Sequence, residues 1–160
     1  MCFMIYTGPI DAWFDFKYGR LGYRTVTFET IYAKGDMQGV TQMNYCDADV
    51  PHTRITEHKH FTYWEKHEDT ILFKEFSKET TPDDIPYYPK RLQNDKTLLL
   101  QYRADAEKLA NTSFLGRLAT YRYMDMHHVI GEALEFGHAF LEARATKAVP
   151  PVFPNSEAAS

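Results

Sequence analysis

Cysteine is scarce in this sequence, which has Cys2 and Cys46 and no others among its 160 residues. Two cysteines cannot form the disulfide framework of a small secreted domain, so we expect a reducing compartment and a cytoplasmic location. No apolar run reaches the roughly 18 residues that a membrane-spanning helix needs. The opening residues, MCFMIYTGPI, lack the basic flank of a signal peptide. The sequence therefore predicts neither a membrane span nor a leader.

Excess positive charge and the common cofactor motifs are also missing. Eighteen Lys and Arg stand against 22 Asp and Glu, a net charge of −4, so no basic stripe is present to bind nucleic acid. The eight glycines form no P-loop, GxSxG or GxGxxG pattern. No HExxH or cysteine-rich zinc spacing occurs, and the adjacent His127 and His128 should point about 100° apart on a helix. We therefore expect no metal site, and read His58 and His60 as polar residues on one face of a strand.

The middle of the sequence alternates between apolar and polar residues. This pattern predicts an antiparallel sheet. Its strands are expected at residues 24–32, 40–46, 54–61 and 70–76. A buried strand is predicted at Phe3–Tyr6, a short helix just after it, and another strand at Thr112–Leu115. A helix from an Asp95 N-cap to about Ala110 completes an α+β pattern.

The last predicted helix opens at Asp125. Apolar residues recur there at helical spacing and form one stripe: Met126, Val129, Ile130, Ala133, Leu134, Gly137, Phe140 and Leu141. The helix start offers unpaired amides and the positive end of the helix dipole, which suit an anion or a polar ring edge. The plainer alternative for Asp125 is a capping role alone.

A set of arginines and tyrosines is the most suggestive group for binding: Arg24, Arg54, Tyr88, Arg117 and Tyr123. Arginine forks onto phosphate through two parallel hydrogen bonds, and tyrosine adds a hydroxyl donor. The alternative is that each of these arginines is an ordinary surface or salt-bridge residue. Glu75 shares a predicted strand face with two apolar residues, so burial would raise its pKa. From the residues alone, the sequence indicates an α+β module with an anionic-ligand cleft.

Four segments of the sequence resemble the C-terminal half of the UDP-galactopyranose mutase family. They read YTGPIDAWFDFKYGRLGYRTVTFET, TRITEHKHF, PYYP and GRLATYRYMDMHHVI, and they lie at residues 6–30, 53–61, 86–89 and 116–130. They follow the family's order at about its spacing, and the resemblance covers roughly residues 3–145.

The resemblance implies a flavoenzyme that interconverts UDP-galactopyranose and UDP-galactofuranose, with reduced FAD as a covalent catalyst, for galactofuranose-containing cell-surface polysaccharide. It implies an antiparallel substrate-side sheet plus an incomplete piece of a Rossmann-like FAD domain, made of the first strand, a late strand and the C-terminal helix. The expected divisions are residues 1–18 for the FAD-domain strand and helix, 19–93 for the sheet domain, 94–147 for the return to the FAD domain, and 148–160 for a disordered tail.

The resemblance also assigns site residues. Substrate would be bound by Arg24, Arg54, Tyr88 and Tyr123, and Arg24, Arg54, Glu75 and Asp125 would be catalytic. FAD would be bound by Arg117, Met124, Asp125, Met126, His127, His128 and Val129.

The family's first half, with its GxGxxG motif, has no counterpart in this sequence. We therefore expect a chain that is inactive alone and needs that N-terminal half as a partner. The alternative is a degenerate module that binds a nucleotide-sugar or a protein without catalysis. Sugar specificity and homo-oligomerisation stay open.

Overall fold

The computed structural model describes residues 2–154. The chain divides into two compact units, Met1–Tyr23 with Ile85–Ser160, and Arg24–Asp84. The first unit combines helices with a parallel strand pair, and the second is an antiparallel sheet. The mixed content and the antiparallel sheet confirm the α+β prediction. No helix within residues 2–154 combines the length and the apolar character needed to cross a bilayer.

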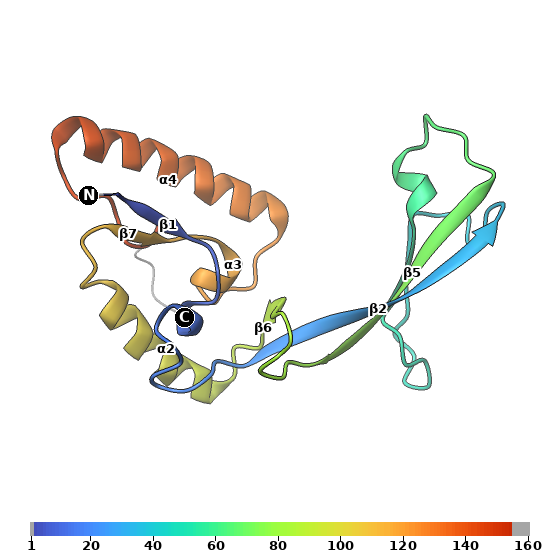
Figure 1. Cartoon of the computed structure of the whole chain (residues 1–160), viewed down its shortest axis with the longest axis horizontal. Coiled ribbons are helices and arrows are strands. Elements are labelled where there is room, and N and C mark those ends of the chain that lie inside the picture. Colours follow the sequence, from blue (N-terminus) through green and yellow to red (C-terminus); the bar gives the residue numbers. More distant parts are fainter. Residues whose placement is uncertain (1, 155–160) are drawn as a thin grey trace. The chain divides into compact units, whose positions relative to one another are not determined.

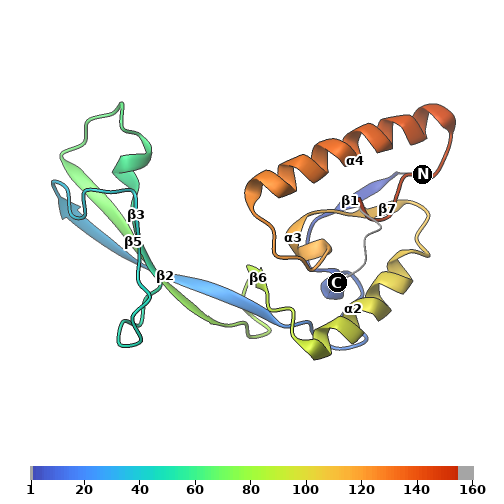
Figure 2. The same cartoon turned by 180° about the vertical axis from the view of Figure 1, so that it is seen from behind.

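The first unit is built around two short parallel strands. β1 (Met4–Tyr6) pairs with β7 (Thr112–Phe114). Figures 1 and 2 show the long helix α4 on one side of this pair and α2 on the other. The remaining elements of the unit are α1 (Ile10–Trp13), β6 (Tyr88–Pro89), α2 (Gln93–Ala106), α3 (Gly116–Ala119) and α4 (Met126–Thr146).

Aromatic side chains fill the core of the first unit. Phe114 is fully buried, and its ring contacts Tyr6, Trp13 and Phe153 at centroid distances of 5.7, 5.7 and 5.6 Å. Full burial of one such ring stabilises the fold by about 1.5–3 kcal/mol, so this cluster is a main source of stability. The core also contains Ile10, Leu21, Tyr23, Leu99, Tyr102, Ala106, Ala119 and Tyr121.

Helix α2 begins before the position predicted for it. Its N-cap is Leu92, and Asp95 lies in the first turn, where its carboxylate accepts the Leu92 amide at 3.0 Å. The helix ends at Ala106 rather than near Ala110, because the amides of Lys108 and Leu109 bond three residues back and tighten the chain into a turn. The N-cap of α4 is Asp125, as predicted.

Two apolar segments of the first unit, β1 and one face of α4, are largely exposed, as expected for a chain without the family's first half. In β1, Met4 is 48% and Ile5 51% exposed. In α4 the buried residues are Glu132, Phe136 and Ala143. The predicted stripe instead points outward, with Met126, Ile130, Leu134 and Leu141 at 84, 60, 64 and 66% exposure. Residues 2–154 thus leave the apolar face of α4 uncovered.

The segment after α4 differs from the disordered tail that the sequence predicts. The Phe114 amide donates to the Val152 carbonyl at 2.8 Å, and the Ser113 hydroxyl donates to the Pro151 carbonyl at 2.5 Å. Phe153 is 8% exposed and packs in the core, because its ring stacks on Phe114. Residues 155–160 of the predicted tail lie outside the described residues.

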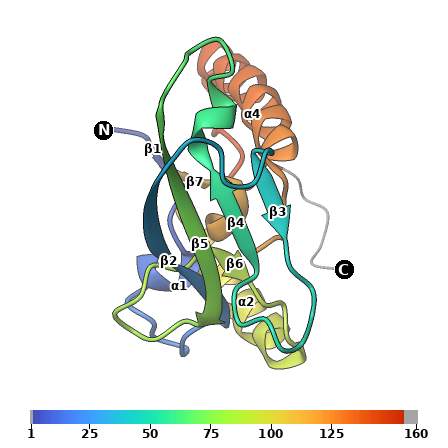
Figure 3. The ribbon, with the colours of Figure 1, turned by 90° about the vertical axis from the view of Figure 1, so that its right-hand side faces the viewer.

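The second unit is a twisted antiparallel sheet. Its strands are β2 (Tyr23–Lys34, of which Tyr23 belongs to the first unit), β3 (Gln42–Asn44), β4 (Arg54–Glu57) and β5 (Asp69–Glu79). They lie in the order β3-β4-β5-β2, as Figure 3 shows. The register of β2 and β5 runs from Arg24 opposite Glu79 to Lys34 opposite Asp69.

The strand predicted at residues 54–61 is only half right. It ends at Glu57, and the next four residues form the 3₁₀ helix η1 (His58–Phe61). His58 and His60 therefore do not share a strand face, contrary to the prediction. Alternation over so few residues cannot separate a strand from a turn, and the contacts of Glu57 described below fix this bend.

Candidate functional site

Three side chains from separate segments of the first unit stack on one another. The guanidinium carbon of Arg117, in α3, lies 4.6 Å from the centre of the Tyr88 ring. The Tyr88 ring stacks on Tyr123, with centroids 6.2 Å apart and planes 24° apart. Tyr123 is 61% exposed, so this Arg117–Tyr88–Tyr123 stack opens to solvent. It combines a fixed cation with ring faces and is suited to a polar anionic ligand.

The start of α4 follows Tyr123 directly in the chain. The Asp125 side chain makes no capping hydrogen bond, and Asp125, Met126, His127 and His128 are exposed. The first amides of this long helix thus lack a side-chain acceptor from the N-cap, which leaves donors and the positive dipole end available to a ligand. The other two predicted cofactor residues are more covered, since Met124 is 7% exposed and Val129 is half-buried.

The histidines at the helix start do not diverge as predicted. The ring centres of His127 and His128 lie 4.0 Å apart. Together with Asp125 they place one ligand atom each within 4.8 Å of one another. Asp36, Glu57 and His60 do the same in the second unit, so these two groups are where the described residues bring metal-ligand atoms together.

In the second unit, Arg24, Arg54 and Glu75 lie on one face of the sheet. Arg24 is opposite Glu79, and Arg54 is opposite Glu75. Opposite residues share a face, as do alternate residues along β5, so the register places all of them on the same side. The resemblance assigned Arg24, Arg54 and Glu75 to the site, and the sheet brings these three together.

Both arginines of this face have carboxylate partners near the surface. Arg24 Nη1 lies 3.2 Å from Glu79 Oε1, and Arg54 Nη1 lies 3.9 Å from Glu75 Oε2. Arg24 Nε donates to the Ser77 hydroxyl at 2.9 Å, and Arg54 Nε donates to the side-chain oxygen Oδ1 of Asn44 at 3.0 Å. An exposed ion pair such as Arg24–Glu79 contributes about 1 kcal/mol or less, so a phosphate can replace the Glu79 carboxylate at little cost. Glu75 itself is largely covered, with 15% of its side chain exposed.

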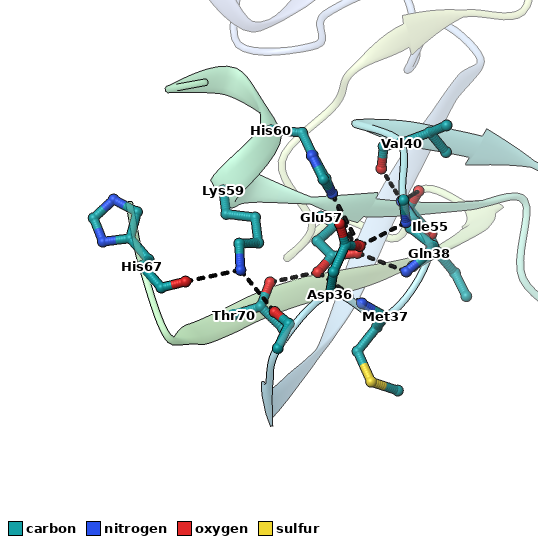
Figure 4. Close-up of polar contacts among 12 residues, drawn as sticks. Asp36, Met37, Gln38, Val40, Ile55, Glu57, Lys59, His60, His67 and Thr70 are labelled. Atoms are coloured by element: carbon teal, nitrogen blue, oxygen red, sulfur yellow. Dashed lines mark hydrogen bonds and ion pairs between the residues drawn. The ribbon is translucent and has the colours of Figure 1, made fainter. Parts of the chain in front are cut away.

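A buried carboxylate that the sequence did not single out organises the far end of this sheet (Figure 4). Glu57 has no exposed surface. Its oxygens accept the Thr70 hydroxyl at 2.7 Å, the Gln38 amide at 2.8 Å and the Met37 amide at 3.1 Å. Burial alone would raise the pKa of Glu57, but these three hydrogen bonds outweigh it and hold the pKa below its usual value.

The loop held by Glu57 also carries a contact between a histidine and an aspartate. His60 Nε2 lies 3.2 Å from Asp36 Oδ1 and 3.8 Å from Glu57 Oε2. The Gly39 amide donates to Asp36 at 2.7 Å, and this bond, with His60, lowers the pKa of Asp36. Glu57 thereby joins β4, β5, η1 and the loop after β2, and this explains why the strand stops at Glu57.

Asp11 is a second buried carboxylate that sequence reasoning missed. It is 1% exposed and accepts the Leu21 amide at 2.9 Å, the Ala12 amide at 3.1 Å and the Tyr23 hydroxyl at 3.3 Å. Burial is the largest effect and raises the pKa of Asp11 despite these donors. A hint was present in the sequence, because Asp11 follows the core residue Ile10 in a segment of aromatic residues.

The chain thus presents two groups that contain arginine, each inside its own unit: the Arg117–Tyr88–Tyr123 stack beside the α4 start, and the arginines of the sheet face. Arginine guanidinium groups and tyrosine hydroxyls are donors that suit phosphate oxygens. A family profile described as UDP-galactopyranose mutase matches residues 1–123. The chain belongs to the UDP-galactopyranose mutase family.

Individual relatives agree with this assignment. The chain is 49% identical over 150 residues to a probable UDP-galactopyranose mutase of Klebsiella pneumoniae, covering 94% of this chain and 39% of that protein. It is 46% identical to a dTDP-fucopyranose mutase of Escherichia coli, covering 87% and 37%. It is 32% identical to a UDP-galactopyranose mutase of Mycoplasma pneumoniae, covering 87% and 36%. The chain spans about two fifths of the length of these curated relatives.

Proposed function

We propose that this chain is the C-terminal part of a flavin-dependent mutase that interconverts UDP-galactopyranose and UDP-galactofuranose. The observation that carries the proposal is the Arg117–Tyr88–Tyr123 stack at the start of α4. The family resemblance assigned these residues one by one, and Tyr88, which lies far in the sequence from Arg117 and Tyr123, contacts both of them. A set of unrelated surface residues would have no reason to do so.

The arginines and tyrosines would hold the diphosphate. A sugar leaves or returns at its anomeric carbon only if the charge that develops on the nucleoside diphosphate is stabilised. Arg24 and Arg54 lie on one sheet face, and guanidinium groups fork onto phosphate oxygens. Such groups need little rearrangement when charge develops, which is the basis of electrostatic catalysis.

The start of α4 fits the negatively charged edge of a reduced flavin. Asp125 leaves the first helix amides without a side-chain cap, and Arg117 lies in the neighbouring helix α3. When bound, reduced FAD would supply the nucleophile for the sugar carbon, and the protein would orient it. The role of this chain at α4 would be to stabilise the anionic flavin through the helix dipole.

The first unit has the features of an incomplete FAD domain. Its parallel pair of β1 and β7 has helices on both sides, and parallel sheets are normally covered and extended by further strands. The exposed apolar residues of β1 and α4 would be covered by the part of the mutase that this chain does not match. A stripe of this size is unusual on a monomer surface.

The sugar itself is the open choice within this proposal. The E. coli relative at 46% identity is a dTDP-fucopyranose mutase, which favours a second candidate of the same reaction type. Both names share a nucleoside diphosphate hexose, and the arginine groups would serve either. Turnover assays with UDP-galactofuranose and dTDP-fucofuranose decide between the two.

Reconstitution tests the proposed function. The purified chain alone should be colourless and should not convert UDP-galactofuranose. Co-expression with the N-terminal part of the Klebsiella pneumoniae relative should give a yellow complex that turns the substrate over after reduction. The Arg117→Gln variant should lose activity in this complex, whereas Arg20→Gln, a surface arginine over the Phe16 ring, should not. Tight FAD binding with turnover by the chain alone would refute the claim that this chain needs the N-terminal part. An inactive, flavin-free complex would refute the proposed function.

A further inference from the structure

One buried carboxylate joins three segments of the first unit. Asp95 is 6% exposed. Its oxygens accept the Leu92 amide at 3.0 Å and the Gly22 amide at 3.2 Å, and the Tyr121 hydroxyl lies 2.8 Å from Oδ2. A side chain at Gly22 would place its Cβ 2.9 Å from Asp95 Oδ2, so any larger residue there would force the carboxylate to shift. Asp95 thus joins the start of α2 to the chain before β2 and to the connector between α3 and α4.

Tyr121 reaches Asp95 from a strained backbone. Its φ is 52°, in the left-handed region that a bulky residue rarely adopts. Its hydroxyl lies 2.6 Å from the Gly22 carbonyl and accepts the Arg91 amide at 3.4 Å, and its ring meets Tyr23 edge-on at 5.2 Å. Strain of this kind persists only where surrounding contacts hold it, and it is frequent at functional sites.

The anchored segments are those that carry the Arg117–Tyr88–Tyr123 stack. Tyr121 lies two residues before Tyr123, and the next amide in the chain, that of Arg122, donates to the Arg117 carbonyl at 3.1 Å. Tyr88 lies just before the Lys90 amide, which donates to the Gly22 carbonyl at 2.9 Å. Each member of the stack is therefore linked to the Asp95–Tyr121 pair by at most two residues of backbone, by backbone hydrogen bonds, or by both.

We infer that Asp95 and Tyr121 are positioning residues for the Arg117–Tyr88–Tyr123 stack, holding its ring-over-guanidinium geometry for a nucleoside diphosphate. The ligand part of this inference rests on the proposed function, whereas the stack geometry does not. Neither residue touches the ligand; both act through the backbone of the stack residues.

The chain offers a matched control for the loss of a buried tyrosine hydroxyl. Tyr102 is fully buried in the same unit; its hydroxyl donates to the Gly19 carbonyl at 2.7 Å and accepts the Tyr18 amide at 3.1 Å. Tyr102→Phe removes a hydroxyl with similar partners, but in a place with no contact to the stack. A purely structural role for Tyr121 predicts the same behaviour from both variants.

The test reads the stack directly by NMR of the full chain labelled at arginine. The Tyr88 ring current should shift the Arg117 side-chain protons upfield. The Tyr88→Ala variant gives the chemical shift of these protons in the absence of the ring. We expect Tyr121→Phe and Asp95→Asn to remove at least half of that shift, and Tyr102→Phe to leave it unchanged. UDP affinity, measured by calorimetry, should fall about fivefold in the first two variants, the effect of one lost hydrogen bond, and stay constant in the control.

The outcomes separate the two proposals. A changed shift with no UDP binding by any form supports the positioning role and counts against the proposed ligand. An unchanged shift in Tyr121→Phe and Asp95→Asn, or an equal change in Tyr102→Phe, overturns the positioning role. Unfolding of both variants overturns it as well, because the pair would then be structural.

Discussion

Replacing the buried carboxylate of Glu57 by an amide should strongly destabilise the sheet unit. In Glu57→Gln one oxygen can still accept the Met37 amide and the Thr70 hydroxyl, but the new NH₂ group faces the Gln38 amide, which donates at 2.8 Å. Two donors then meet in a site with no exposed surface. An unsatisfied buried donor costs about 1–3 kcal/mol and lost charge-assisted bonds add a similar amount, so we expect about 2–4 kcal/mol.

The assay is urea unfolding of the full chain, followed by circular dichroism and by hydrogen exchange of the Met37 and Gln38 amides. These two amides should exchange much faster in Glu57→Gln. The matched control is Glu29→Gln on β2, because Glu29 is 56% exposed and pairs with Lys74 at 3.6 Å. Loss of such a surface pair should change the free energy of unfolding by less than about 1 kcal/mol.

The pH dependence has a defined sign. Because the folded pKa of Glu57 lies below its ordinary value of 4.5, its contribution to stability is present above that pH. It is lost as the pH falls through the lowered pKa. The difference between the parent chain and Glu57→Gln should therefore be largest at neutral pH and shrink in acid. A Glu57→Gln chain as stable as Glu29→Gln at neutral pH, with protected Met37 and Gln38 amides, would refute the reasoning.

Three further predictions concern other parts of the chain. The double change Ile130→Glu with Leu134→Glu should reduce self-association of the isolated chain in sedimentation without lowering its stability, because these side chains are 60 and 64% exposed; a parent chain that stays monomeric at high concentration would contradict this. In the reconstituted complex, Arg54→Lys should raise the KM for UDP-galactofuranose roughly tenfold, because lysine cannot fork onto two oxygens, whereas Arg20→Lys should leave the KM unchanged; an unchanged KM in Arg54→Lys would show that the positive charge alone is sufficient. Burial raises the pKa of Asp11, so this residue contributes most to stability below its ordinary value of 3.8 and progressively less as the pH rises through the raised pKa. In urea titrations at increasing pH, the free energy of unfolding of the parent chain should therefore fall relative to that of Asp11→Asn. A difference that does not depend on pH would contradict the prediction.

Much of the chain follows from local patterns. Alternating residues placed β2 and β5 in an antiparallel sheet, and an aspartate ahead of a helical repeat placed the start of α4 at Asp125. These features depend on neighbours in the sequence, because strand and helix periods and caps are short-range properties. The arginine and tyrosine candidates came from residue chemistry and from the family resemblance, and the contacts within each unit came from the structure alone.

The spacing of apolar residues did not predict which face of a helix is covered by the rest of the unit. In α4 the apolar stripe is the exposed face, and Glu132 is buried because the Arg122 guanidinium reaches both of its oxygens at 2.5 Å. In the same way, Glu57 is buried by partners from three segments, and Tyr88, Arg117 and Tyr123 stack only when distant segments meet. The sequence by itself determined where most strands and helices form, β4 and the limits of α2 apart, and it named the residues predicted to bind a phosphate. Only the tertiary structure decided which side chains are buried and which touch, because burial depends on what packs against a residue rather than on its position in a pattern.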